Sequence, residues 1–308
     1  MLQSEQYIDL CSSLFMKWMM EYEEAGETVD LGQWLQMYAF DVVGELFFGR
    51  RFGFMENRED YNSYIARLDI IVPFVAEALQ ANVSVAAAAR ACVEERQAAM
   101  NDPAATQHLR RDILQQMFEI HDQKGTKVDF TPKAMMQECY MALFAGSDTT
   151  AIAMRAMFYY LMTNPAVYAE LMAELDESLA TGIIPTSGPI SYAQAIKLPY
   201  VCATIKEAMR LHPSVGLTMP RHVPAGGLRI GDQVIPAGYR VGVNAAVVQY
   251  DQSVFGPDSY SFRPRRWLEG DTTHMDRCMI QFGAGTRTCI GKNVGFPFST
   301  DSSKMHQC

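Results

Sequence analysis

One short segment near the C-terminal end combines residue types that could hold a metal. Residues 282–291 read FGAGTRTCIG, so Cys289 lies in a glycine-rich stretch with Arg287 two positions before it. A cysteine thiolate is a metal ligand. Gly285 and Gly291 lack a Cβ, so the backbone can approach a flat group closely or adopt positive φ. The guanidinium of Arg287 offers a fixed cation for an acidic group on that molecule. The alternative is an unreactive cysteine that packs beside an ordinary turn.

The pattern of residues 132–163 predicts a long, buried helix. Thr131 suits the N-cap, Pro132 suits the first turn, and an Asn-Pro pair follows the last residue. At about 1.5 Å per residue the helix would extend roughly 48 Å, enough to cross a whole domain. Asp148 and Arg155 lie inside the span and argue against a transmembrane helix.

Residues 145–150, AGSDTT, interrupt the apolar character of this helix. Such polarity in a buried helix needs compensating interactions. One interpretation is structural, because Ser and Thr hydroxyls can donate to the carbonyl four residues earlier and Asp148 can pair with a cation. The other is functional: the helix opens locally at Gly146 to make room for dioxygen and a water, and Asp148 and Thr149 form a proton path.

Most of the first 212 residues have helical patterns, including residues 31–49. Glu207 and Arg210 stand at i and i+3 on a helix that Pro213 ends, so they share a face. After Pro213 the pattern changes to short strands, with a hairpin over residues 228–235 and long loops to residue 292. The sequence therefore predicts a mainly α fold with a small β portion.

Composition limits the classes of partner. The chain has 308 residues, of which 49% are hydrophobic, ample for a core, and its net charge of −9 excludes a nucleic-acid partner. Its seven cysteines include no Cys-x-x-Cys pair, so neither a disulfide framework nor a zinc ribbon is indicated, and a reducing compartment fits best. No secretory signal opens the chain, and no run of apolar residues is long enough to span a membrane.

These motifs together resemble those of the haem-thiolate monooxygenases, the cytochrome P450 superfamily, in its fungal type. AGSDTT is similar to the oxygen-binding motif of that family, Glu-x-x-Arg to its helix signature, and FRPRRW at residues 262–267 to the loop that supplies a second arginine. The family pattern Phe-x-x-Gly-x-Arg-x-Cys-x-Gly is filled by Phe282, Gly285, Arg287, Cys289 and Gly291. The resemblance implies a cytochrome P450-like fold.

The resemblance also implies a role for each matched residue. Haem b would take an axial thiolate from Cys289, with amide donors from residues 290–292 beside the sulfur. Thr149 would hydrogen-bond the activated oxygen, and Asp148 would relay protons. Glu207, Arg210 and Arg266 would form a structural network. The other haem contacts would be Phe282, Gly285, Arg287, Gly291, Arg221, Ala145 and Gly146, with Arg221 and Arg287 on the propionates. The substrate pocket would be lined by Ala142, Ser214, Leu217 and Met219.

The implied reaction inserts one atom of O2 into a small or medium lipophilic substrate. Electrons would come from an NADPH-dependent reductase, for which the six Lys and Arg of residues 263–292 could form a docking face. The implied location is the cytoplasmic face of the endoplasmic reticulum. The alternatives are an inactive remnant that binds haem weakly or not at all, and a metal-free helical binding module.

The resemblance covers residues 1–293, which we expect to form a partial haem-thiolate domain. The first strands and helices of the family pattern have no counterpart in the sequence. Residues 294–308 depart from the pattern, because a glycine, a proline and a polar run stand where the family has a long helix. We therefore expect an off-pattern C-terminal tail and an incomplete fold.

Overall fold

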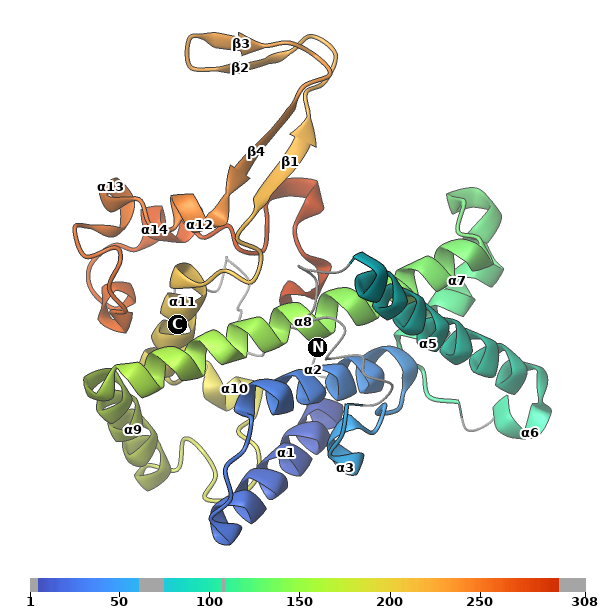
Figure 1. The fold of residues 1–308 in the computed structure, drawn as a ribbon, viewed down its shortest axis with the longest axis horizontal. Helices are drawn as coiled ribbons and strands as arrows, with labels where there is room; N and C mark the ends of the chain where they lie inside the picture. The colour runs from blue at the N-terminus through green and yellow to red at the C-terminus, as the bar shows by residue number, and fades with distance from the viewer. Residues whose placement is uncertain (1–4, 61–74, 107–108, 294–308) are drawn as a thin grey trace. The chain divides into compact units, whose positions relative to one another are not determined.

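The computed structural model describes residues 5–60, 75–106 and 109–293. The chain divides into two compact units, Met1–Ala151 and Ile152–Cys308, and the boundary lies inside helix α8 (Pro132–Thr163). The described residues are mostly helical, with two short two-stranded sheets (Figure 1). The predicted fold class, mainly α with a small β portion, is confirmed. The predicted tail, residues 294–308, lies outside the described residues.

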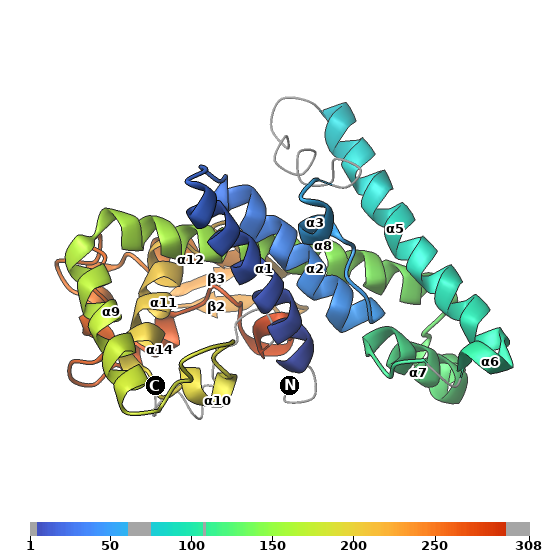
Figure 2. The same ribbon diagram turned by 90° about the horizontal axis from the view of Figure 1, so that it is seen from below.

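The regular secondary structure in the described part of the first unit is all helical. Helix α2 carries apolar residues around most of its axis. It packs against α1, and Figures 1 and 2 show the two helices side by side. The side chain of Asp30 accepts from Gln33 N at 3.0 Å at the start of α2, and Gly49 ends it with φ 70°. The helices are α1 (Glu5–Ala25), α2 (Leu31–Phe48), α3 (Phe54–Asn57), α5 (Val75–Asn101), α6 (Pro103–Thr106), α7 (Ile113–Val128) and the first part of α8.

A buried carboxylate fixes the turn that follows α2. Asp41 is fully buried, and its oxygens accept from the backbone amides of Gly53 at 2.9 Å, Phe54 at 3.4 Å and Met55 at 3.0 Å. Burial raises the pKa of Asp41, and the amide donors act against that rise. The carboxylate thereby holds the first turn of α3 against α2, where the rings of Phe40 and Phe54 stack with centroids 4.9 Å apart.

Helix α8 has the predicted bounds. The hydroxyl of Thr131 accepts from Ala134 N at 3.1 Å, which caps the N-terminus, and the helix ends at Thr163. No helix among the described residues is long and apolar enough to cross a membrane.

The second unit combines short helices with the two sheets. Helix α11 packs against α9 and the 3₁₀ turn η2, and Glu174 caps its N-terminus by accepting from Tyr200 N and Val201 N, both at 2.8 Å. The helices are α9 (Pro165–Ala180), α10 (Tyr192–Ala195), α11 (Pro199–Leu211), α12 (Ala245–Val248), α13 (Gln252–Phe255) and α14 (Thr273–Cys278), with 3₁₀ turns η2 (Pro264–Trp267), η3 (Gly285–Arg287) and η4 (Ile290–Asn293).

The strands are all antiparallel. β1 (Thr218–His222) pairs with β4 (Arg240–Asn244), and β2 (Leu228–Ile230) pairs with β3 (Gln233–Ile235) around a turn at residues 231–232 (Figure 1). The predicted hairpin over residues 228–235 is therefore confirmed. Gly242 in β4 faces β1 so closely that a Cβ there would lie 2.7 Å from Met219 O, so the pairing requires glycine.

The contacts of Asp41 predict a graded loss of stability. Asp41→Ala leaves three buried amides without an acceptor and should lower the free energy of unfolding by about 3 kcal/mol or more. Asp41→Asn keeps one carbonyl oxygen and should cost less. The urea midpoint, followed by tryptophan fluorescence, measures both, with the exposed Glu24→Gln as the control. Equal midpoints for Asp41→Ala and the control would contradict this role.

Candidate functional site

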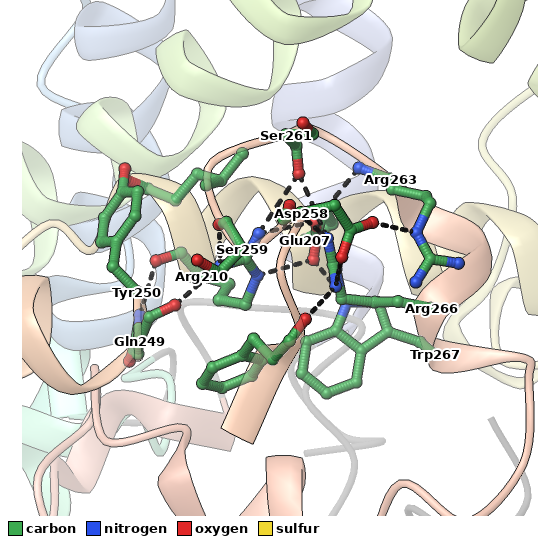
Figure 3. A network of polar contacts seen from close by, with 12 residues as sticks. Glu207, Arg210, Gln249, Tyr250, Asp258, Ser259, Ser261, Arg263, Arg266 and Trp267 are labelled. Carbon is green, nitrogen blue, oxygen red and sulfur yellow. Dashed lines mark hydrogen bonds and ion pairs between the residues drawn. The ribbon is translucent and has the colours of Figure 1, made fainter. Parts of the chain in front are cut away.

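The carboxylate of Glu207 is the centre of a buried polar network in the second unit (Figure 3). Its Oε1 accepts from Arg210 Nη2 at 2.8 Å, Arg266 Nε at 2.8 Å and Arg263 N at 3.1 Å. Its Oε2 accepts from Arg210 Nε and Trp267 Nε1, both at 2.9 Å. Glu207 is 0% exposed, so these five donors replace the water that burial removes.

The guanidinium of Arg210 binds the loop that follows α12. In addition to Glu207, it donates from Nη1 to Gln249 O at 2.7 Å and Ser259 O at 2.6 Å, and from Nη2 to Ser261 O at 3.3 Å. All five N–H groups of the fully buried side chain therefore have an acceptor. Lysine, with a single ammonium, could not serve these acceptors in their positions.

Arg266 joins the same network from η2. Besides its bond to Glu207, its Nη1 donates to Phe255 O at 2.6 Å, and its Nη2 donates to Asp258 O at 3.0 Å. Burial alone would raise the pKa of Asp258, but hydrogen bonds from Arg263 and Arg266 outweigh burial and hold this pKa below its usual range. The structure thus brings together Glu207, Arg210 and Arg266, as the resemblance implies.

Gln249 is a member of this network that the sequence analysis missed. Its side chain is fully buried and donates from Nε2 to Met209 O at 3.1 Å and Arg210 O at 2.8 Å. Its Oε1 accepts from Ile280 N at 3.1 Å. Gln249 therefore ties the last turn of α11 to the segment that leads into the cysteine loop. Its own position in the sequence carries no motif signal.

The cysteine loop is closed by its own backbone. Cys289 N donates to Phe282 O at 2.8 Å, and Gly283 and Gly285 have φ of 73° and 67°, which favour glycine. A Cβ at Gly283 would lie 3.8 Å from Met219 Sδ, so β1 packs beside the loop. Cys289 is exposed, whereas the other cysteines of the described part are buried or half-buried. The loop therefore presents one accessible thiol.

Beside this sulfur the chain forms the 3₁₀ turn η4, in which Lys292 N donates to Cys289 O at 3.3 Å. That the amides of residues 290–292 also donate to the sulfur stays a prediction. The Sγ of Cys289 lies 3.7 Å from where a Cβ at Gly291 would stand, so glycine keeps the space beside the sulfur open.

The two arginines expected to bind acidic groups are exposed and make no ion pair with a described residue. Arg221, on β1, donates only to backbone carbonyls, at 3.0 Å to Pro220 O and 3.5 Å to Met219 O. Arg287 lies in η3, two residues before Cys289. Both guanidinium groups are therefore available to an anionic ligand.

The AGSDTT segment, residues 145–150, is a regular part of α8, so the expected local opening at Gly146 is not present. A Cβ at Gly146 would lie 2.7 Å from Val43 Cγ2, which shows that glycine serves the close packing of α2 on α8. The hydroxyls of Ser147 and Thr149 donate back to Leu143 O and Ala145 O, both at 2.7 Å. These bonds correspond to the structural interpretation of the segment.

The predicted site residues are divided between the two units. Asp148, Thr149 and Ala142 lie on the part of α8 that belongs to the first unit, and the cysteine loop belongs to the second. Ser214 and Met219 are half-buried, and Leu217 is 75% exposed. The residues predicted to line the substrate pocket thus belong to different units, and the pocket itself stays a prediction.

The comparisons with known proteins identify the family. The profile described as Cytochrome P450 matches residues 1–296. The chain is 42% identical to the cytochrome P450 monooxygenase gsfF of Penicillium aethiopicum, over 94% of this chain and 62% of the relative. It is 37% identical to the cytochrome P450 monooxygenase ACRTS1 of Alternaria alternata, over 96% of this chain and 84% of the relative. A pisatin demethylase of Fusarium vanettenii is 33% identical, over 96% of this chain and 59% of the relative.

The chain thus belongs to the cytochrome P450 family, and the relatives named above are fungal. It spans a little under two thirds of the length of gsfF and a larger share of ACRTS1. The family implies a haem cofactor with cysteine thiolate ligation.

The donor set around Cys289 fits such a cofactor. Within the described residues, no group of three or more His, Cys, Asp or Glu side chains could hold a metal ion. A metal bound by Cys289 must therefore bring most of its ligands with it, as the iron of haem brings the porphyrin nitrogens. The unpaired guanidinium groups of Arg221 and Arg287 suit the haem propionates.

The predicted basic docking face is smaller than the sequence suggests. Arg263 pairs with Asp258 at 2.5 Å and with Glu269 at 2.5 Å, and Arg265 pairs with Glu170. Arg266 is buried and forms an ion pair with Glu207. Half of the six basic residues of 263–292 are thus compensated by carboxylates, which reduces the charge available to attract an acidic partner.

The network predicts the effect of removing Arg210. Arg210→Ala leaves the buried Glu207 charge and three carbonyls without this partner, so we expect a loss of about 3–5 kcal/mol in stability and little or no haem in the purified protein. Arg210→Lys should restore only part of either property. Haem content by pyridine haemochrome and the urea midpoint measure the two effects. Arg229→Ala, which removes an exposed side chain, is the control, and wild-type haem content in Arg210→Ala would contradict the role.

Proposed function

We propose that this chain is a haem-thiolate monooxygenase, which inserts one oxygen atom of O2 into a small or medium lipophilic substrate. The observation that carries the proposal is the thiol of Cys289, the only exposed one among the cysteines that the structure describes, in a glycine-rich loop that is tied to the buried Glu207 network. The relatives' names support the reaction class, since gsfF and ACRTS1 are both named monooxygenases.

Several residues of the cysteine loop, together with Arg221 on β1, have a task in this proposal. Cys289 would supply the thiolate that holds the haem, Phe282, Gly285 and Gly291 would shape the surface against which the flat cofactor lies, and Arg221 and Arg287 would hold its propionates. Ala145 would contribute a small side chain next to the cofactor, whereas Gly146 serves the close packing of α2 on α8. When bound, haem held by a cysteine thiolate would supply the reductive activation of dioxygen.

Thr149 and Asp148 deliver protons in the proposed reaction. The Thr149 hydroxyl donates to Ala145 O in this structure, so it must rotate away from that carbonyl to donate to an oxygen in the site. This rotation requires no opening of α8. Asp148 is half-buried on the same helix and would replace the proton that Thr149 gives up.

Substrate and redox partner follow from the same proposal. The pocket for the lipophilic substrate would be lined by Ala142, Ser214, Leu217 and Met219. Electrons come from an NADPH-dependent reductase, which would meet the basic residues left uncompensated by carboxylates, Arg277 and Arg287 among them. The proposed location is the cytoplasmic face of the endoplasmic reticulum, and residues 1–293 form the haem-thiolate part of the protein.

The test is the spectrum of the purified chain supplied with hemin. We expect the reduced carbon monoxide complex to show the red-shifted Soret band of a thiolate ligand, because Cys289 is accessible. Cys289→Ser should lose this band, whereas Cys278→Ser, which removes a half-buried thiol, should keep it. A colourless folded protein would instead support the metal-free binding module, and aggregation without the band would support the inactive remnant.

The proton path predicts uncoupling in one variant. Thr149→Ala removes the donor, so we expect product formation to fall by about 10²-fold while NADPH oxidation continues and hydrogen peroxide accumulates. The peroxide formed per NADPH consumed is the quantity to measure. Thr163→Ala is a matched control, because Thr163 makes the same type of bond, to Tyr159 O at 2.8 Å, near the end of α8. Unchanged coupling in Thr149→Ala would remove the role.

A further inference from the structure

The first unit contains a cavity of about 460 Å³ that includes none of the residues assigned above. It lies between the C-terminal half of α5, α7 and the first turn of α8. Its volume falls within the range of small-molecule sites, about 300–1,000 Å³. Buried Val93, Phe118 and Met135 form its apolar wall.

The charged groups on the wall of this cavity are carboxylates. Glu94 and Asp122 are exposed, and neither makes an ion pair with any residue in the described ranges. No lysine or arginine lines the cavity, and the amide side chains of Gln97 and Asn101 add further oxygen acceptors. The cavity therefore favours a ligand that carries positive charge and donates hydrogen bonds.

His121 adds a fixed acceptor to this set. Its Nδ1 lies 2.8 Å from Phe130 O, and because a carbonyl oxygen only accepts, Nδ1 must carry the hydrogen. In the neutral ring Nε2 is then an acceptor. A Cβ at Gly125 would lie 2.8 Å from Nδ1, so the glycine leaves room for the ring in this orientation.

A bare metal ion does not match the cavity, because the described His, Cys, Asp and Glu side chains nowhere converge on one point closely enough to hold it. A larger cation with an apolar body satisfies both the carboxylates and the wall, and the thioethers of Met100 and Met136 can adapt to its shape. We propose that this cavity is a binding site for a lipophilic organic ammonium ion, an amine with an aryl or alkyl body. The site is separate from the cysteine loop and does not depend on the proposed reaction.

The test uses the full chain with ¹³C-methyl methionine and two probes of equal size, 4-phenylbutylammonium and the neutral 4-phenylbutan-1-ol. We expect saturable shifts of the methyl signals of Met100, Met135 and Met136, assigned by Met→Leu variants, on addition of the ammonium. The alcohol should bind at least about tenfold more weakly, because it lacks the charge-assisted hydrogen bonds.

Variants separate charge from shape. Glu94→Gln combined with Asp122→Asn should weaken the ammonium at least about tenfold and leave the alcohol unchanged. Glu138→Gln, on the same helix α8 but not on the cavity wall, should change neither. Ala98→Trp should exclude both probes by filling the space. Equal affinity for the two probes, unchanged binding in the double variant, or shifts confined to other methionines would overturn the proposal.

Discussion

The rest of the second unit is arranged around one buried carboxylate, that of Glu207. A charge without access to water is tolerated only when hydrogen bonds replace hydration. Glu207 has five such donors, from its own helix, from the backbone before η2 and from η2 itself (Figure 3). Because Arg210 and Arg266 also bind carbonyls of residues 249–261, this loop has to fold around α11.

A continuous set of contacts leads from this carboxylate to the thiol. The backbone carbonyl of Gln249 accepts a hydrogen bond from Arg210, and its side-chain oxygen accepts one from Ile280 N. The cysteine loop then closes on itself between Phe282 and Cys289. The accessible thiol is thus presented by a loop whose starting point is fixed in the core. A cofactor that brings most of its own metal ligands would need only this one ligand from the protein.

The features that the sequence predicted well are those that depend on local chemistry. The bounds of α8 follow from a capping threonine and a terminal Asn-Pro pair, and the hairpin follows from its turn. Glu207 and Arg210 are three residues apart on one helix, so their pairing needs no knowledge of the fold. Arg266 could be added only through the family resemblance.

The features that the sequence did not predict depend on long-range contacts. Gln249 binds groups 31 to 40 residues away, so no short motif marks it. The polar residues around Gly146 suggest a point of helix opening, but the close neighbour of Gly146 is Val43 on another helix. The charge count of residues 263–292 suggests a basic face, but it does not show that Arg265 pairs with Glu170.

The most direct test of the central claim is native-state hydrogen exchange in the wild type and in Glu207→Gln. The uncharged glutamine side chain binds Arg210 and Arg266 more weakly than the carboxylate does. The account therefore predicts that the amides of Ile280 and Cys289 exchange at least about tenfold faster in the variant than in the wild type. Amides of α2, in the other compact unit, should keep their rates and serve as the internal reference. Unchanged protection of Ile280 and Cys289 in this variant would contradict the claim that the Glu207 network holds the cysteine loop.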